Sequence, residues 1–419
     1  MIAIVEPEPE PEPEPGVVVP TSRFSRVAVF AALFPPAFLG GGPIRTLEAL
    51  LSSAPRRFSI SLLTSDRDLN AHGRLPVASN QWVKVRQAKV YFASIDNPVR
   101  LIQALHRLRL DRPQVLYLNS FFNPKLSILP QLLWRAGFWG RSRRLVAPRG
   151  EFGHGALQRR TFKKRAFIFV YRLLRLDRDV WWHASSEGEA ADIVRVWGSA
   201  AQVVIREDET SLPSTALSVP ETRPESFGLR AAVLGRVVEH KGLMVLLQAL
   251  ATVAAPVILD VFGPEEDATF AARCRVAASR LPDHVRIEFR GILAPEVVRS
   301  TLSSYDVLLM PTAGENFGHV IAESLSASCP VVCTPYTPWT ETLEQGGGHV
   351  VEDRSVEAWG RALNEYAEYQ GMELRRRRVQ AGEAYARWKS QESEPHVFEL
   401  FERQLTSLEL SLLIDRGTN

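Results

Sequence analysis

The segment 231–242, AAVLGRVVEHKG, decides which fold class this chain is expected to adopt. Its first four residues form an apolar run of strand type, and a glycine-framed basic turn follows at 235–242. The apolar residues of 243–253 then recur at helical spacing. A strand that passes through a glycine turn into a helix begins a β/α unit, whose ligands bind at the carboxyl end of the strand. The segment therefore predicts an α/β protein.

The same turn is a candidate anion site, because it carries two cations between its glycines. Gly235 permits a close backbone approach, and a helix N-terminus favours negative charge. Arg236 and Lys241 can hold phosphate oxygens. The turn lacks the G-x-x-x-x-G-K-[ST] pattern, so it is not a P-loop. A solvated basic turn without a ligand is the alternative interpretation.

Short apolar runs alternate with helical runs on both sides of this segment. A polar, proline-bearing stretch without periodicity, 207–227, separates two such series. The alternation predicts parallel sheets with helices on both faces, and hence two Rossmann-like units that face each other across a cleft. The expected strands are 26–31, 58–63, 115–118, 145–147, 180–184, 203–205, 231–234, 257–262, 285–289, 307–310 and 331–333. The expected helices include 99–110, 124–136, 187–196, 243–253, 268–280 and 319–327.

The length of 419 residues also favours two domains. Residues 1–22 form a tail in which glutamate and proline alternate from Glu6 to Pro15. We expect it to be disordered and extended, because proline removes backbone donors and the glutamates repel one another. The remaining boundaries are a first unit at 23–208, a linker at 209–227, a second unit at 228–390 and a helical segment at 391–419.

Composition and charge exclude several classes of protein. A hydrophobic fraction of 45% and a charged fraction of 23% exclude fibrous and globally disordered chains. The net charge of +3 is too small to argue for bulk nucleic-acid binding. Three cysteines cannot form a disulfide scaffold. Because we find no leader pattern and no apolar run of about 18 residues, we expect a cytoplasmic protein.

A second candidate site is the segment 315–323, ENFGHVIAE, which follows an expected strand. Two carboxylates straddle a glycine: Glu315 lies on the loop, and Glu323 lies near the second turn of the next helix. A carboxylate accepts hydrogen bonds from paired hydroxyl groups, such as those of a sugar or a ribose. Taken singly, each glutamate is also consistent with an ordinary surface residue.

The sequence offers little support for a metal site. Two Asp-x-Asp pairs, 66–68 and 177–179, have a central arginine and flank element ends, which favours surface turns. Cys329 and Cys333 lack partners at metal-ligand spacing, which favours small core residues. We therefore expect no metal.

An ordered series of motifs resembles the C-terminal half of the retaining glycosyltransferases of family 4, the group 1 glycosyl transferases. The series comprises GRVVEHKG, FGPEED at 262–267, GILAPEVV at 291–298 and GENFGHVIAESLSASCPVV at 314–332. In the first half, PRGE at 148–151 and HASSE at 183–187 look like a bacterial branch of the same family. The resemblance implies the GT-B architecture. It also implies that the C-terminal helix returns to the first unit.

The resemblance also implies roles for individual residues. Arg236 and Lys241 would hold the diphosphate of a nucleotide-sugar, and Glu323 would bind the ribose. Catalysis would fall to Arg236, Lys241 and Glu315. Donor binding would fall to Gly235, Asn316, Phe317, Gly318 and Glu323. Gly40, Gly41 and Gly42 would form a phosphate or acceptor loop at a helix start, and Arg149, His154 and His183 are acceptor-side candidates. For His183, which follows an expected strand, a structural role is equally open.

The activity implied is retaining transfer of a sugar from a nucleotide-diphosphate sugar to an acceptor hydroxyl. The first unit would face a sugar or lipid-linked glycan acceptor, as in bacterial surface or exopolysaccharide synthesis, and the second would bind the donor. No cofactor is implied beyond this co-substrate, no metal and no nucleic acid. Two alternatives remain open: a nucleotide-sugar 2-epimerase of the same architecture, and a non-catalytic protein that binds nucleotide-sugars or glycans.

The basic stretch 159–178 suggests a further partner. Phe167, Val170, Tyr171 and Leu174 are expected on one helical face, with lysines and arginines around them. Such a helix can lie on an anionic lipid surface, which would place the protein peripherally on the inner face of the membrane. The alternative is a helix packed on the core with a solvated basic side.

Overall fold

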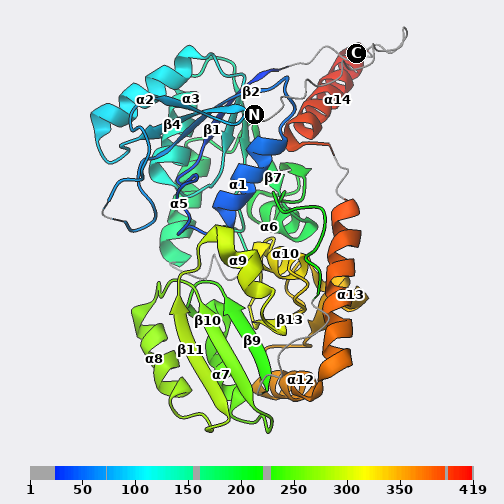
Figure 1. Cartoon of the computed structure of the whole chain (residues 1–419). Helices are drawn as coiled ribbons and strands as arrows, with labels where there is room; N and C mark the ends of the chain where they lie inside the picture. Colours follow the sequence, from blue (N-terminus) through cyan, green and yellow to red (C-terminus); the bar gives the residue numbers. More distant parts are fainter. Residues whose placement is uncertain (1–23, 72, 154–160, 220–227, 392–394, 418–419) are drawn as a thin grey trace, which may run out of the picture.

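The computed structural model describes residues 24–71, 73–153, 161–219, 228–391 and 395–417. They form two α/β units, each built on its own sheet (Figure 1). His154 and the Glu-Pro tail lie outside the described residues. Both sheets follow the alternating pattern read from the sequence, with helices on their two faces.

The first unit holds an eight-stranded sheet with the order β3-β4-β2-β1-β5-β6-β7-β8. Its strands are parallel except for β3, which pairs antiparallel with β4. These two strands form a hairpin that the sequence analysis did not anticipate. The strands are β1 (Arg26–Phe30), β2 (Ser59–Ser65), β3 (Trp82–Val85), β4 (Ala88–Ala93), β5 (Val115–Leu118), β6 (Arg143–Val146), β7 (Val180–Ala184) and β8 (Gln202–Ile205).

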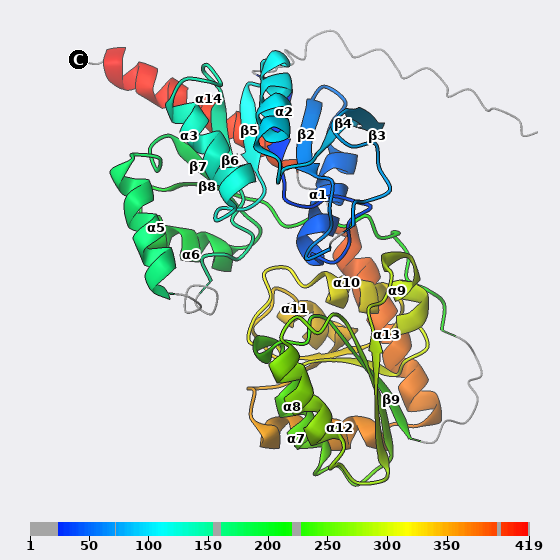
Figure 2. The same ribbon diagram turned by 90° about the vertical axis from the view of Figure 1, so that its left-hand side faces the viewer.

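Helices cover both faces of this sheet (Figure 2). Because successive strand residues point to opposite faces, Val27 and Val29 of β1 join one hydrophobic cluster and Ala28 and Phe30 join another. The first cluster includes the buried faces of α1 and α14, and the second those of α2 and α6. The helices are α1 (Gly42–Ser53), α2 (Pro98–Leu110), α3 (Leu129–Arg135), α5 (Thr161–Leu173) and α6 (Glu187–Trp197), with a π-helical turn at Pro124–Ile128.

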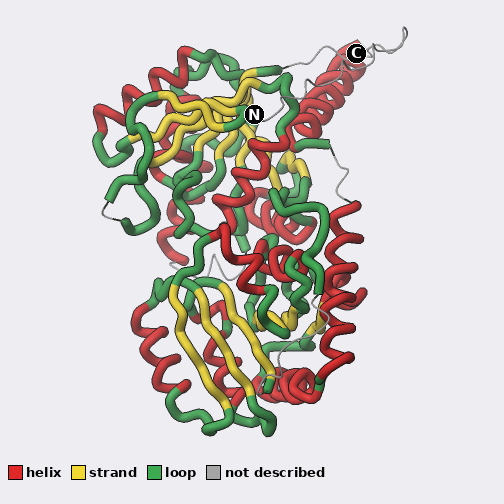
Figure 3. The backbone as a smooth tube through the Cα atoms, viewed as in Figure 1, coloured by secondary structure: helices red, strands yellow, loops and turns green. Residues whose placement is uncertain are grey.

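The second unit holds a six-stranded, all-parallel sheet with the order β11-β10-β9-β12-β13-β14 (Figure 3). Its strands are β9 (Leu229–Leu234), β10 (Val257–Phe262), β11 (Val285–Gly291), β12 (Val307–Met310), β13 (Val331–Cys333) and β14 (Gly348–Val350). Its helices are α7 (Leu243–Leu250), α8 (Ala268–Ala278), α9 (Pro295–Leu302), α10 (His319–Ser326), α11 (Thr340–Thr342), α12 (Val356–Glu368) and α13 (Gly371–Ser390), with short helical turns at Glu239–Lys241 and Leu343–Gly347.

The last helix, α14 (Val397–Gly417), packs on the first unit although α13 packs on the second. Phe401 is fully buried, and its ring lies 5.7 Å from that of Phe24 and 5.5 Å from that of Trp181. His396, just before α14, has its Nε2 3.0 Å from the carbonyl oxygen of Leu50 on α1. The end of the chain thus completes the core of the first unit.

The basic stretch 159–178 contains α5, whose buried side differs from the one expected. Tyr171 is buried and Phe167 is half-buried, as expected, but Val170 and Leu174 are each 45% exposed. The hydrophobic residues are divided between two sides of the helix, so a large apolar surface remains on the outside.

One pair of aspartates also differs from the expected surface turns. Asp66 is 1% exposed, and its carboxylate accepts a hydrogen bond from Ser94 Oγ at 2.7 Å. Asp68 accepts the backbone N–H groups of Phe38 and Leu39, at 2.9 and 3.2 Å, and so holds the loop that leads to the glycines before α1. These aspartates therefore organise a loop. Asp177 and Asp179 are exposed, as expected.

We predict that Phe401→Ala will destabilise the first unit by about 3–5 kcal/mol, because it removes a buried ring and leaves a cavity. Differential scanning calorimetry should show the unfolding transition of the first unit moved to lower temperature. Leu408→Ala on the same helix is the control, since Leu408 is 39% exposed. An equal shift in both variants would contradict the packing described for α14.

Candidate functional site

The carboxyl ends of the two sheets carry the loops that bring the units together. The loop after β1 leads to the N-terminus of α1, and the loop after β12 leads to the N-terminus of α10. These two helix starts lie side by side in both views (Figures 1 and 2). Thr46 Oγ1 of α1 lies 2.6 Å from His319 Nε2 of α10, and Asn316 Nδ2 donates to Ser185 Oγ at 2.7 Å. Residues from both units therefore form one site.

The basic turn after β9 lies against the end of β12 because of a glycine. Gly242 has φ 78°, and a Cβ atom there would lie 2.0 Å from the carbonyl oxygen of Pro311. Any other residue would push the turn away. The backbone N–H of Ala313 also donates to the carbonyl of His240 at 2.8 Å. The turn and the loop after β12 thus form one rigid wall.

Arg236 and Lys241 both line a small pocket at the ends of β9, β10 and β12, together with Gly235 and Thr312. The sequence analysis predicted that these two cations would act together, and the fold brings them to one place. The pocket lies where a parallel sheet offers a binding site, at the carboxyl ends of its strands.

Carboxylates of the second unit neutralise both cations. Lys241 Nζ lies 2.6 Å from Glu315 Oε1, and the Glu315 side chain is only 12% exposed. Arg236 Nη1 lies 2.9 Å from Glu266 Oε2, in a pair whose side chains are about two-fifths exposed. The exposed pair is weak, so Arg236 can turn to an anionic ligand at little cost.

Glu323 lies buried in α10 and is 5% exposed. It forms an ion pair with Arg45 of α1, which belongs to the other unit. Its Oε2 atom is buried and has no hydrogen-bond partner among the described residues. An unpaired carboxylate oxygen is costly to bury, and a ligand hydroxyl that donates to it would remove that cost.

Aromatic packing holds the loop between the two glutamates. Gly318 has φ 88° at the start of α10, and the Phe317 ring lies 5.5 Å from that of Trp339. Trp339 Nε1 donates to the Phe317 carbonyl at 2.6 Å. The backbone N–H of Glu315 donates to the Tyr336 carbonyl at 3.0 Å. The loop is therefore fixed before any ligand arrives.

His319 belongs to the site, and the sequence analysis did not single it out. It is half-buried at the first position of α10, and a Cβ atom on Gly42 would lie 3.0 Å from its ring. Thr46 Oγ1 donates its one proton to Asp208 Oδ2 at 3.1 Å, so the same oxygen accepts from His319 Nε2. Burial, assisted by Arg45 and Arg149, lowers the pKa of His319 to about 3. The available signal was its place directly after Gly318.

Arg149 is enclosed within the first unit. Its side chain is 6% exposed, donates to Asn119 Oδ1 at 2.8 Å and to the Tyr117 hydroxyl at 2.7 Å, and forms an ion pair with Asp208. Burial acts to lower the pKa of Arg149, but Asp208 and the other groups around it outweigh burial and raise it. Arg149 therefore holds a loop in place, and Gly150 beside it lies next to Asn316.

Of the other candidates in the first unit, His183 is structural and the three glycines lie at the edge of the site. His183 is 2% exposed and has partners on both ring nitrogens, Tyr117 OH at 2.8 Å and the Arg206 carbonyl at 3.0 Å. Burial holds its pKa well below the usual range, so this histidine is structural. Gly41 precedes α1 with φ 70°, and Gly40 and Gly42 flank it at the edge of the site. No group of three or more potential metal-binding side chains occurs among the described residues.

Residues 228–385 match the family described as glycosyl transferases group 1. The match covers nearly the whole of the second unit. The chain is 31% identical over 140 residues to D-inositol 3-phosphate glycosyltransferase of Corynebacterium urealyticum, covering 32% of this chain and 33% of that protein. It is 29% identical over 248 residues to phosphatidyl-myo-inositol mannosyltransferase of Mycobacterium leprae, covering 54% and 62%. The chain thus spans one third and about three fifths of these curated relatives.

Solved structures extend the likeness of the group 1 domain to the whole fold. Anabaena Alr3699/HepE in complex with UDP and glucose superposes with a TM-score of 0.61 at 15% identity, covering 92% of this chain and 100% of that one. The sucrose-phosphate synthase of Thermosynechococcus elongatus gives the same TM-score at 16% identity, with the same coverage. The two-unit GT-B fold expected from the sequence is confirmed.

The lowered pKa of His319 predicts a pH dependence of stability. A histidine is protonated near pH 6.5 in the unfolded chain but only near pH 3 in the fold. The unfolded state binds more protons between these values, so stability falls as the pH falls from 6.5 towards 3, by up to about 1.4 kcal/mol per pH unit.

Urea unfolding between pH 7 and pH 4 measures this slope. His319→Gln keeps a donor for Thr46 but does not titrate, so its stability should fall less steeply with acid. His183 and His396, whose pKa values are also lowered, remain in both proteins and cancel in the comparison. Identical slopes would show that His319 is not held neutral by the fold.

Proposed function

We propose that this chain is a retaining glycosyltransferase that transfers a sugar from a nucleotide-diphosphate sugar to an acceptor hydroxyl. The observations that carry the proposal are the pocket that Arg236 and Lys241 share and the buried, unpaired Oε2 of Glu323 in α10, the helix that follows β12. It offers two cations for a diphosphate and a carboxylate oxygen for a ribose hydroxyl. The group 1 match supports the same donor class.

Arg236 and Lys241 would bind the diphosphate and stabilise the charge that grows on it as the sugar leaves. Their present partners, Glu266 and Glu315, would give way to the more strongly charged ligand. Fixed cations at a developing anion lower the barrier without reorganisation at the moment of reaction. Two such cations can perform the neutralisation that a metal ion performs elsewhere, so we propose a transfer that needs no metal and no cofactor.

Glu323 would bind the ribose through its unpaired oxygen. Its other partner, Arg45, comes from the first unit, so donor binding at Glu323 would also act on a contact between the units. Glu315 and the loop 316–318 would face the donor sugar. We propose no protein nucleophile for this transfer.

Retention follows if the acceptor arrives on the face from which the diphosphate leaves. The bond between the anomeric carbon and the phosphate oxygen breaks as the acceptor oxygen bonds to that carbon. The acceptor proton passes to the departing diphosphate oxygen. Neutral His319 lies beside this site and can accept a hydrogen bond through Nδ1, since Nε2 donates to Thr46.

The acceptor we propose is a sugar or a lipid-linked glycan of bacterial surface or exopolysaccharide synthesis. Both curated relatives carry inositol compounds in their names, one of them a phosphatidyl-inositol. The HepE structure was solved with UDP and glucose, which makes UDP-glucose the first donor to test. Because of the names of the two relatives, polyols and lipid-linked compounds are the first acceptors to test with this donor.

A lipid-linked acceptor would be reached from the membrane surface, and α5 offers a suitable face. Phe169 and Leu173 are 67% and 69% exposed, and Val170 lies beside them. Lys163, Arg165 and Arg175 are exposed on the same segment. An apolar face bordered by cations binds anionic lipid, so we propose peripheral attachment to the inner membrane surface. No helix of the described residues is long and apolar enough to cross a membrane.

Turnover of the donor tests the enzyme. Arg236→Ala should lower kcat by about 100-fold, because it removes one preorganised charge at the leaving group. Glu323→Gln should chiefly raise KM for the donor, by about 10-fold or more, because a hydrogen bond to a charged group is lost. Release of nucleotide diphosphate from UDP-sugars, with EDTA present, is the measurement.

The control is Arg286→Ala, since Arg286 is exposed on β11 and outside the pocket. Assays with and without acceptor separate transfer from epimerisation, which needs no acceptor. A parent protein that binds UDP-sugars but turns over none would leave only a binding role.

Vesicle co-sedimentation tests the membrane face. Phe169→Asp with Leu173→Asp should weaken binding to vesicles of anionic lipid by about 10-fold or more, because each apolar side chain contributes about 1.5–3 kcal/mol when buried. Ile102→Asp on α2 is the matched control, since Ile102 is 65% exposed on another helix. Binding that ignores both the anionic lipid content and the α5 substitutions would refute the attachment.

A further inference from the structure

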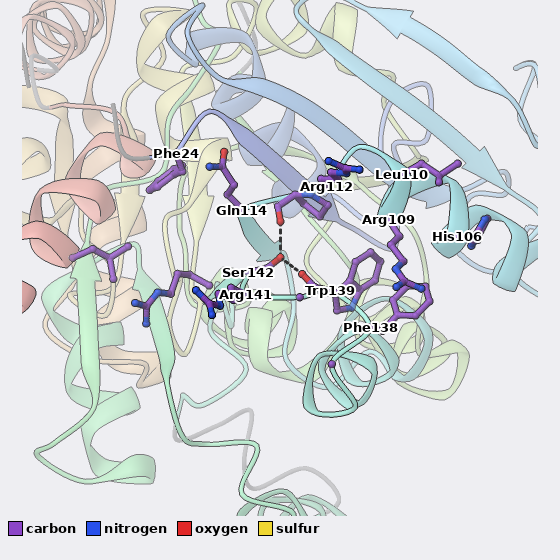
Figure 4. Close-up of a pocket in the computed structure, with 15 residues that line it drawn as sticks. Phe24, His106, Arg109, Leu110, Arg112, Gln114, Phe138, Trp139, Arg141 and Ser142 are labelled. Atoms are coloured by element: carbon purple, nitrogen blue, oxygen red, sulfur yellow. Dashed lines mark hydrogen bonds between the residues drawn. The ribbon is translucent and has the colours of Figure 1, made fainter. Parts of the chain in front are cut away.

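A second cavity, larger than the pocket of Arg236 and Lys241, lies at the amino ends of strands of the first sheet. Figure 4 shows the residues that line it. Its volume is about 850 Å³, and its walls come from residues just before β1, β5 and β6, from the end of α2 and from α14. Phe24 precedes β1, Gln114 precedes β5 and Ser142 precedes β6. The cavity therefore sits at the amino ends of these strands and has no part in the chemistry proposed above.

The cavity is basic. Four arginines line it, Arg109, Arg112, Arg141 and Arg143, with His106 beside them, and all five side chains are exposed to solvent. No carboxylate occurs among its lining residues. Like charges gathered in one hollow repel each other and raise the potential there, so the cavity attracts an anion.

The walls of the cavity are rigid and partly aromatic. Ser142 Oγ lies 2.5 Å from the carbonyl oxygen of Pro113 and 2.7 Å from that of Trp139, so its one proton is shared between them (Figure 4). The side chain of Gln114 accepts the backbone N–H of Ser25 at 2.9 Å. Phe138 is half-buried, and the Arg109 guanidinium lies 4.7 Å from its ring centre. A site with a guanidinium beside an aromatic ring can bind both an acidic residue and a proline. The guanidinium pairs with the carboxylate, and the proline ring packs on the aromatic surface.

We propose that this cavity binds the N-terminal Glu-Pro tail of the same chain. Phe24 lines the cavity, and residues 1–23, which include the tail, come directly before Phe24 in the sequence. The tail holds five glutamates, and the rest of the chain would carry a formal charge of +8 in place of +3 without them. The densest run of negative charge in the sequence is thus joined by a short segment to a residue of a cavity lined by four arginines.

The tail has the length and the pattern that this binding requires. Glu14 lies ten residues before Phe24, and an extended chain covers about 3.3 Å per residue, so Glu14 reaches any point within about 33 Å. In a polyproline II conformation every third residue shares a face, so Glu6, Pro9 and Glu12 would line up. Such a face presents carboxylates to arginines and a proline ring to Phe138.

Zero-length cross-linking of carboxylates to amines tests the proposal on the full-length chain without using its activity. The cavity holds no lysine, so Arg109→Lys supplies an amine with little change of charge. Carbodiimide treatment at low protein concentration should join position 109 to Glu6, Glu8, Glu10, Glu12 or Glu14, as identified by mass spectrometry. Replacing all five glutamates by glutamine should abolish the product.

The matched control is Arg100→Lys, since Arg100 is exposed on the same helix but in its first turn, outside the cavity. The tail should cross-link to position 109 several times more than to position 100. The product should also vanish in 1 M salt, where screening acts within about 3 Å. Equal yields at the two positions would overturn the proposal.

Hydrogen exchange supplies a readout that leaves the arginines intact. Amides of 137–143 should exchange more slowly in the parent than in the five-glutamine variant, and the difference should disappear in 1 M salt. Equal exchange in the two proteins would overturn the proposal. Anionic vesicles that protect 137–143 equally in both proteins would instead assign the cavity to lipid headgroups and would also overturn it.

Discussion

The buried ion pair between Arg149 and Asp208 holds the two halves of the site in register. Removing two charges from water is costly, and the pair is stable only because other polar groups complete it. Arg149 also reaches Tyr117 on the central part of the first sheet, and Asp208 accepts from Thr46 on α1. Thr46 in turn accepts from His319 of the second unit. A continuous polar chain therefore leads from one sheet core to the start of α10.

This polar chain explains why the site is assembled before a ligand arrives. The buried partners leave Arg149 and His183 no freedom to act on a substrate, so they support the loops that do. The groups that remain adaptable lie in the second unit, where Arg236 is exposed and Glu323 has an unpaired oxygen. The first unit therefore supplies rigid loops, and the second unit supplies the charged groups that can change partners.

The two edges of the first sheet have opposite roles. At its carboxyl edge the strands lead into loops that touch the second unit, as parallel sheets generally do at their binding edge. At its amino ends the same strands begin beside a basic cavity, which Phe24, the first described residue, helps to line. The helix α14 packs on the core of the first sheet and also lines this cavity through Leu405. It therefore contacts both that core and Phe24, the first described residue.

The alternation of strands and helices was readable from the sequence, because buried parallel strands are short apolar runs and the glycine turns that follow them need specific residues. The β3–β4 hairpin was not, since Lys84, Arg86 and Lys89 interrupt its apolar pattern at the sheet edge. Asp66 looked like a surface residue because its partner, Ser94, lies far along the chain. The same holds for the Arg45 and Glu323 pair, whose members belong to different units.

Local chemistry thus specified the fold class, the basic turn and the two glutamates around Gly318, because each depends on neighbours within a few residues. Contacts between distant segments were settled by the packing of the two units. They made Arg149 and His183 structural, brought His319 into the site, exposed Phe169 and Leu173 of α5, and gathered four arginines at the amino edge. The physical reason is that burial, and with it charge state and partner, is a property of the whole assembled chain and not of any one segment.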